Sequence, residues 1–291
     1  MTTLHVRHRT VYRYARPVTF GEHRLMCRPH DSHDLRLLET SLTITPAAQV
    51  RWLHDVFGNS VAIATFSQMA SELVFDSSFR AEHYPAKSHE QVLESYARKL
   101  PFSYAAEEVP DIGRAMERHY PDPQHRVDRW ADALVAADPG QTPLELLTRM
   151  ARTIKREFRY QGREEMGTQT PLETLDLGSG SCRDFALFMM EAARSLGMAA
   201  RFVSGYLYDQ KLLSAGAGMV GGGATHAWMQ VYLPGAGWVE FDPTNALVGG
   251  LNLIRVAVAR DAAQAAPLGG SFIGAPADYL GMRVEVQVAT G

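Results

Sequence analysis

Hydrophobic and polar residues alternate along about the first 85 residues, the pattern produced by strands with one buried face. Leu4 and Val6 begin this alternation at even spacing. Residues 51–54 and 60–66 repeat it on either side of Gly58-Asn59, a pair that suits the positive backbone angles of a hairpin turn. Several short strands with turns between them predict a small antiparallel sheet or sandwich.

Helical spacing interrupted by prolines replaces this pattern from residue 88 to about residue 140. We expect an irregular helical connector there, packed between two domains. Two helices then begin with the same signal, Thr142-Pro-Leu-Glu145 and Thr170-Pro-Leu-Glu173. Each signal places threonine at the N-cap, proline at the first helical position and glutamate three residues after the cap, which is a capping box.

A third helix is predicted to begin near Cys182, because apolar residues recur there at helical spacing until Gly197 provides a C-terminal cap. Strands are expected at residues 200–208, 225–233 and 238–241, with further strands at 256–258 and 283–288 closing the second domain. The chain therefore divides into a β-rich N-terminal domain (1–87), a helical connector (88–140) and a C-terminal α+β domain (141–291).

Length and composition indicate a soluble protein of about two domains, with 291 residues, 46% of them hydrophobic and 21% charged. A net charge of −3 argues against a general binder of nucleic acid or of anionic membranes. No apolar run approaches the ~20 residues that cross a bilayer. The first residues lack the apolar stretch of a signal peptide, so we expect a cytoplasmic location.

Cys27 and Cys182 are the two cysteines of the chain, which excludes a disulfide framework and a zinc site built from paired cysteines. Cys182 lies in Gly180-Ser-Cys182-Arg-Asp, at the first turn of the predicted helix. The peptide dipoles and free amides at a helix N-terminus favour a thiolate, which is the nucleophilic form of cysteine. Its own amide is placed to donate to a substrate oxyanion. The alternative is that Cys182 is a small buried apolar residue, as we expect of Cys27.

A thiol nucleophile needs a base, and His226 begins the strand predicted at 225–233. Asp242 ends the next strand, where a carboxylate would orient the imidazole and stabilise its charged form. The loop between the strands sets the register. Three or five loop residues place Asp242 opposite Trp228 on the face of His226, whereas four place it on the other face. We expect an odd number of loop residues, since glycines 235 and 237 permit a three-residue turn with a bulge.

These motifs together resemble the bacterial transglutaminase-like family, part of the transglutaminase-like cysteine protease superfamily. They are Gly-Ser-Cys182-Arg-Asp-Phe185, Arg201-Phe-Val-Ser-Gly-Tyr206, His226-Ala-Trp228 and Trp238-Val-Glu-Phe-Asp-Pro-Thr-Asn245. Asp55-Val-Phe-Gly-Asn59 and Arg255-Val-Ala-Val-Ala-Arg-Asp261 resemble segments of its N-terminal domain and C-terminal end. The resemblance implies a papain-like α+β core, in which the cysteine helix packs on an antiparallel sheet. It also implies Cys182 as nucleophile, His226 as base and Asp242 as its orienting residue.

The function expected is acyl transfer or hydrolysis at a carboxamide or peptide bond through a thioester on Cys182, with a peptide or protein as substrate. The same triad serves amidohydrolase, cysteine peptidase and transglutaminase. The alternative is a catalytically inactive protein-binding scaffold on the same fold. Whether the glycine-rich loop 214–223 is a lid beside His226 or a plain surface loop stays open.

We expect no cofactor and no metal. Gly216-Ala-Gly218-Met-Val-Gly221 matches the dinucleotide fingerprint only in form, because a strand follows it where that motif requires a helix. Calcium-loop spacing is not found in the sequence. Histidines 23, 30 and 33 have no regular ligand spacing and are expected to be solvated loop residues.

Overall fold

The computed structural model describes residues 2–84, 92–162, 167–208 and 223–290. The strands are β1 (Thr2–Phe20), β2 (His23–Arg28), β3 (Leu35–Thr45), β4 (Ala48–His54), β5 (Ser60–Phe66), β6 (Ala70–His83), β7 (Arg159–Tyr160), β8 (Ser179–Gly180), β9 (Ala200–Leu207), β10 (His226–Leu233), β11 (Gly237–Asp242), β12 (Leu247–Val248), β13 (Leu253–Ala259), β14 (Leu268–Gly269), β15 (Phe272–Ile273) and β16 (Tyr279–Thr290). The α-helices are α1 (Val109–Met116), α2 (Arg126–Ala136), α3 (Pro143–Glu157), α4 (Pro171–Leu177) and α5 (Cys182–Ser195). Short 3-10 helices are η2 (Ser95–Arg98), η3 (Ala262–Ala265) and η4 (Pro276–Asp278).

The N-terminal strands form a β-sandwich, as the alternating pattern predicts. One sheet has the order β15-β1-β6-β3, with β16 also paired to β1, and the facing sheet has the order β14-β2-β5-β4. Alternate residues of β1 are buried, Leu4 and Val6 among them. The predicted hairpin joins β4 to β5, and Gly58 takes a φ of +78°, which glycine adopts without a steric penalty.

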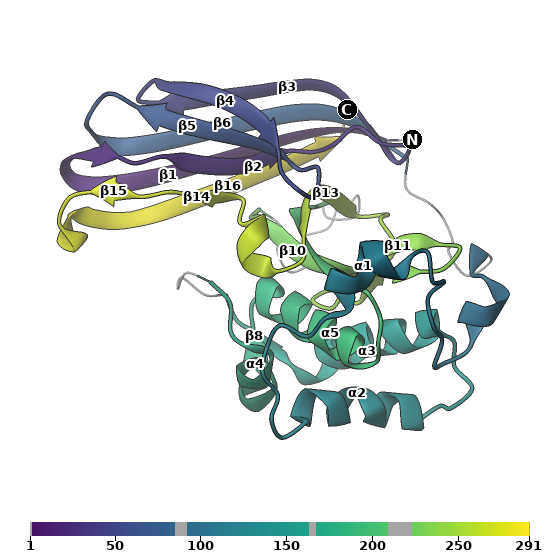
Figure 1. Cartoon of the computed structure of the whole chain (residues 1–291). Coiled ribbons are helices and arrows are strands. Elements are labelled where there is room, and N and C mark those ends of the chain that lie inside the picture. The colour runs from purple at the N-terminus through teal and green to yellow at the C-terminus, as the bar shows by residue number, and fades with distance from the viewer. Residues whose placement is uncertain (1, 85–91, 163–166, 209–222, 291) are drawn as a thin grey trace.

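The C-terminal strand forms where a strand was expected, but its partner differs from the expectation. β16 pairs antiparallel with β1 from Leu4 to Tyr14, so residues 283–288 extend the N-terminal sandwich and do not close the second domain. β14 and β15 likewise pair with β2 and β1. In Figure 1 the strand β16 lies along the sandwich, at the opposite end of the sequence from its partner β1. The N-terminal unit is therefore built from both ends of the sequence.

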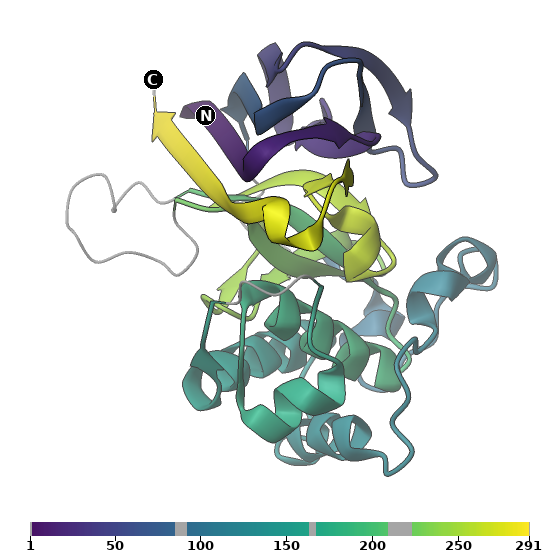
Figure 2. The ribbon, with the colours of Figure 1, turned by 90° about the vertical axis from the view of Figure 1, so that its left-hand side faces the viewer.

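A second antiparallel sheet, with the order β12-β11-β10-β9-β13, lies between the sandwich and the helices (Figures 1 and 2). Helix α5 packs on β10 and β9, with α2, α3 and α4 beyond it. The inward residues of β10, which are Ala227, Met229, Val231 and Leu233, belong to the core shared with the helices. This is the α+β core that the sequence predicts.

The connector contains helices, but its position differs from the expectation. Helix α2 packs against α3, α4 and α5, and its Trp130 ring lies 4.8 Å from that of Phe188. It therefore belongs to the helical layer, on the side of the molecule away from the sandwich (Figure 1). The sandwich itself contacts the second sheet through a buried apolar cluster that includes Leu4, Val6 and Ile254. Within the described residues, none of the helices combines the length and apolarity required to cross a membrane.

Candidate active site

Cys182 is the first residue of helix α5 and follows the short strand β8. Residues at this position have backbone amides that lack a partner in their own helix, and the helix dipole there favours negative charge. Only 8% of Cys182 is exposed. The predicted position at a helix N-terminus is confirmed.

Asp184 fixes the start of this helix. Its carboxylate accepts hydrogen bonds from the Ser181 amide and hydroxyl, both at 2.8 Å, and from the Gln169 amide at 2.7 Å. The Ser181–Asp184 pair forms a capping box, like the two predicted at Thr142 and Thr170, which are also present. A side chain at Gly180 would lie 2.8 Å from the Asp184 Cβ, so the backbone before Cys182 can pass this point because residue 180 is glycine.

The register of β10 and β11 places Asp242 on the face of His226. Leu233 pairs with Gly237 and Met229 with Phe241, so the loop between them has three residues. One step further along the ladder, Asp242 lies opposite Trp228, on the same face as His226. The odd number of loop residues expected from the sequence is confirmed, and the number is three.

His226 and Asp242 form a buried hydrogen bond. The imidazole Nε2 lies 2.8 Å from the Asp242 Oδ2, and both side chains are fully buried. Asp242 Oδ2 also accepts from the Asn245 amide group at 2.9 Å, and its Oδ1 accepts from the Thr244 backbone amide at 2.9 Å. A carboxylate with this many donors is fixed in position. Asp242 can therefore orient the ring, as the sequence predicts.

Cys182 lies next to the His226 imidazole, as Asp242 does. Because Asp242 takes Nε2, the nitrogen left for the thiol is Nδ1, which is buried and has no hydrogen-bond partner of normal geometry among the described residues. Burial by itself would lower the pKa of His226, but the charge and hydrogen bond of Asp242, together with the neighbouring Cys182, raise it to about 10. The structure thus brings all three predicted residues together.

Asn245 and Thr244 are the residues of this site to which the sequence analysis gave no role. They follow Asp242 in a turn and donate to both oxygens of its carboxylate. Asp followed by Pro-Thr-Asn is a signal for a side chain that accepts from the turn backbone, and it could have indicated this support. The Asn245 carbonyl in turn accepts from Lys155 Nζ at 2.9 Å, which ties the turn to α3.

Other candidate residues serve packing. Trp228 is fully buried, with its ring stacked on His226 at 6.0 Å between centroids. His23 was expected in solvent, but it is buried among aromatic rings and bonded to the Gly21 carbonyl, because it begins strand β2. The part of the chain that the structure describes contains no group of three or more His, Cys, Asp or Glu placed to hold a metal ion. The glycine-rich loop 214–223, apart from residue 223, lies outside the residues that the structure describes.

Comparison with known proteins agrees with this arrangement. Residues 4–82 match the bacterial transglutaminase-like N-terminal region, and residues 129–243 match the transglutaminase-like superfamily. The second match contains Cys182, His226 and Asp242. Together the two matches span roughly two thirds of the chain.

Relatives extend the similarity over most of the sequence. An uncharacterised protein of Mycobacterium leprae is 28% identical over 256 residues, covering 87% of this chain and 76% of its own. One from Mycobacterium tuberculosis is 29% identical over 279 residues, covering 91% and 86%. A crystal structure from Cytophaga hutchinsonii, described as a candidate cysteine protease, has a TM-score of 0.72 at 18% identity and covers 99% of this chain and 90% of that one. The chain belongs to the transglutaminase-like superfamily, with a bacterial transglutaminase-like N-terminal region ahead of the core.

Proposed function

We propose that this protein is a thiol enzyme that transfers or hydrolyses the acyl group of a carboxamide or peptide bond through a thioester on Cys182. The observation that carries the proposal is a buried imidazole bonded to Asp242 on one side and next to Cys182 on the other. Side chains in these three roles activate a thiol for attack on a carbonyl.

In the first half-reaction the Cys182 sulfur attacks the carbonyl carbon, and a carbon–sulfur bond forms. The oxyanion that develops would be stabilised by the Cys182 backbone amide at the first position of α5. The carbon–nitrogen bond then breaks, and His226 gives its proton to the departing amine or ammonia. Asp242 keeps the imidazole oriented while its charge changes.

In the second half-reaction water or a primary amine attacks the thioester carbon. His226 takes the proton of this nucleophile, the carbon–sulfur bond breaks, and the thiolate of Cys182 is restored. Water gives a carboxylic acid and an amine gives a new amide, so the same three residues serve hydrolysis and transamidation. A peptide or protein substrate is proposed from superfamily membership and from the description of the Cytophaga hutchinsonii protein.

Intact-protein mass spectrometry tests the proposal. The protein is incubated with a library of glutamine-containing peptides, with and without cadaverine as the amine. We expect an acyl adduct on the wild type, no adduct on Cys182→Ala, and an unchanged adduct on Cys27→Ala, since Cys27 is buried in the sandwich core. Turnover of the adduct to acid or to cadaverine amide then assigns the reaction.

Iodoacetamide labelling separates an active enzyme from an inactive scaffold without a substrate. Near neutral pH an activated Cys182 reacts far faster than Cys27, because burial raises the pKa of the Cys27 thiol. Equally slow labelling of both cysteines, with no peptide adduct, would contradict the enzymatic proposal and favour the scaffold.

A further inference from the structure

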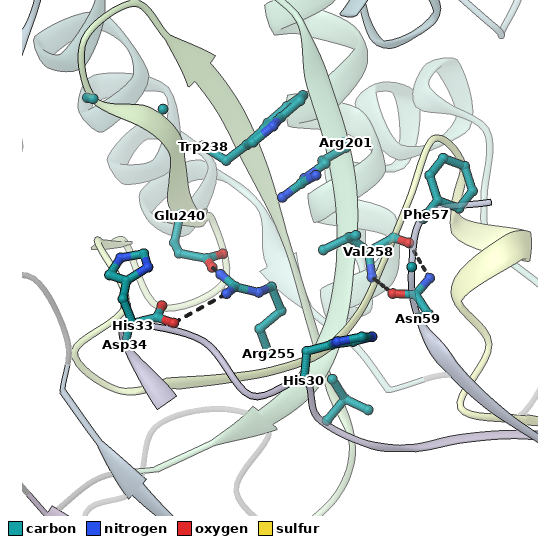
Figure 3. A pocket seen from close by; sticks show the side chains of 15 residues that line it. His30, His33, Asp34, Phe57, Asn59, Arg201, Trp238, Glu240, Arg255 and Val258 are labelled. Atoms are coloured by element: carbon teal, nitrogen blue, oxygen red, sulfur yellow. Dashed lines mark hydrogen bonds and ion pairs between the residues drawn. The ribbon is translucent and has the colours of Figure 1, made fainter. Parts of the chain in front are cut away.

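A cavity of about 510 Å³ lies between the β-sandwich and the outer face of the second sheet (Figure 3). Its walls come from two loops of the sandwich, at residues 30–34 and 57–59, and from strands β9, β11 and β13. Cys182, His226 and Asp242 are absent from its described lining, so this cavity is separate from the proposed catalytic site. Its volume is within the range of small-molecule pockets.

A row of polar side chains crosses three strands beside the cavity, and its two outer members, Arg201 and Glu240, line the cavity. Gln230 pairs with Arg201 of β9 and with Glu240 of β11 in the ladder, so the three side chains share one face of the sheet. Arg201 Nε donates to Gln230 Oε1 at 2.6 Å, and Gln230 Nε2 donates to Glu240 Oε1 at 2.6 Å. Both ends of the Gln230 amide are therefore occupied.

The two carboxylates of the cavity are paired with its other arginine. Arg255 Nη1 lies 3.0 Å from Glu240 Oε1, and Arg255 Nη2 lies 3.5 Å from Asp34 Oδ1 (Figure 3). Glu240 also accepts a hydrogen bond from the Trp228 indole, and Asp34 accepts one from the Ser32 hydroxyl. Both carboxylates therefore form their ion pairs with Arg255, and the charge of Glu240 acts on Arg201 without an ion pair between the two side chains.

Arg201 is the other cation of the cavity, and its guanidinium is linked to Glu240 only through Gln230. Within the described parts of the chain it forms no ion pair, and its terminal nitrogens make no hydrogen bond. Its guanidinium carbon lies 4.1 Å from the centre of the Trp238 ring, which covers one face of the group. Burial lowers the pKa of Arg201 to about 10 against the opposing effect of Glu240, so the group is charged at neutral pH. A charged guanidinium in a buried site is stabilised by an anion in contact with it.

The rest of the lining is largely apolar. Trp238 and Phe57 present aromatic rings, and Val256 and Val258 present aliphatic side chains. We propose that this cavity binds a small-molecule carboxylate with an apolar or aromatic body, and that Arg201 recognises the carboxylate. A planar carboxylate matches the fork of the guanidinium. A single unpaired cation beside Glu240 and Asp34 is a poor match for a dianion such as phosphate.

Isothermal titration calorimetry with 3-phenylpropionate tests the proposal on the full chain. The uncharged 3-phenylpropanamide and inorganic phosphate serve as comparison ligands. We expect the carboxylate to bind with a Kd below about 1 mM and at least about tenfold more tightly than the amide or phosphate. Tryptophan fluorescence gives a second readout, because Trp238 covers Arg201. Equal binding of carboxylate and amide, tighter binding of phosphate, or no binding of the carboxylate would each overturn the proposal.

Two variants locate the binding site. Arg201→Met removes the charge and should weaken carboxylate binding at least about tenfold, whereas Arg51→Met, an exposed arginine on β4, should leave it unchanged. Gly250→Phe tests the cavity without touching the polar row, because a Cβ at Gly250 meets open space and the residue lines the cavity. It should block binding. Undiminished binding to both folded cavity variants would overturn the assignment. These measurements need no activity, so their outcome is independent of the proposed function.

Discussion

At the residue scale, the proposed reaction depends on the imidazole of His226, which lies between the Asp242 carboxylate and the Cys182 thiol. Asp242 is fixed by Thr244 and Asn245, so its distance to His226 does not depend on the thiol. Cys182 is fixed separately by the start of α5. The imidazole lies between two groups, Asp242 and Cys182, that are anchored independently of each other. Both groups raise the pKa of His226.

Asp242→Asn tests this connection with little change in shape. The amide keeps a polar partner for the ring but removes the negative charge that favours the imidazolium. We expect the pKa of His226 to fall by more than about one unit and the alkylation of Cys182 at neutral pH to slow at least about tenfold. NMR titration of the His226 ring and iodoacetamide kinetics measure the two effects. An unchanged His226 pKa would contradict the role given to Asp242.

His226 also makes stability depend on pH in a defined direction. Its pKa is about 10 in the folded protein against an ordinary value of 6.5, so the folded state holds this proton more tightly. The resulting stabilisation is fully present below about pH 6.5 and is lost as the pH rises toward about 10. We expect the difference in unfolding free energy between wild type and His226→Gln to shrink across this window by at least about 1 kcal/mol. Urea unfolding at several pH values measures it, and a constant difference would contradict the raised pKa.

At the element scale, the start of α5 positions Cys182, the proposed nucleophile. Asp184 accepts three hydrogen bonds there and is fully buried, whereas the corresponding capping residue of α3, Glu145, is exposed. We expect Asp184→Ala to lower the unfolding free energy by about 2–4 kcal/mol and Glu145→Ala by about 1 kcal/mol. Urea unfolding compares the two. Equal losses would show that burial adds nothing to this cap.

Local patterns predicted these elements well because their causes are local. The capping boxes at Thr142 and Thr170 depend on four consecutive residues, and the side of Asp242 depends on one short loop. The partner of β16 depends on which sheet edge is free in the folded molecule. Alternation within residues 283–288 indicates a strand and its buried face, but it does not indicate the sheet edge with which the strand pairs.

The cavity beside Arg201 shows the same limit of prediction from local sequence patterns. Alternation along β10 places Gln230 on the polar face with His226, as expected from the sequence. The partners of Gln230 come from neighbouring strands, and the walls opposite them come from the sandwich, more than a hundred residues away. His30 and His33 line this cavity and are exposed loop residues, as the sequence predicts for them. A sequence predicts a face more readily than it predicts what covers that face.

At the scale of the whole molecule, the sandwich and the second sheet are joined by side-chain contacts that protect a sheet edge. β13 is the edge strand of the second sheet, and the sandwich covers it. Asn59 donates from Nδ2 to the Val258 carbonyl at 2.7 Å and accepts on Oδ1 from the Val258 amide at 2.9 Å. One side chain thus replaces the missing neighbour strand at this position, since both unpaired backbone groups of the edge are satisfied.

Asn59→Ala should therefore weaken the junction more than an ordinary loss of one hydrogen bond. It leaves a buried N–H and a buried C=O of Val258 without partners, so we expect a loss of about 2–4 kcal/mol in unfolding free energy. Asn252→Ala is the matched control, because Asn252 donates to the Tyr208 carbonyl within the second sheet, and it should cost about 1 kcal/mol. Urea unfolding gives both values, and hydrogen exchange at the Val258 amide should speed up in the first variant only. If the two variants lose equal stability and the Val258 amide stays protected, Asn59 does not hold the sandwich to the edge of the catalytic sheet.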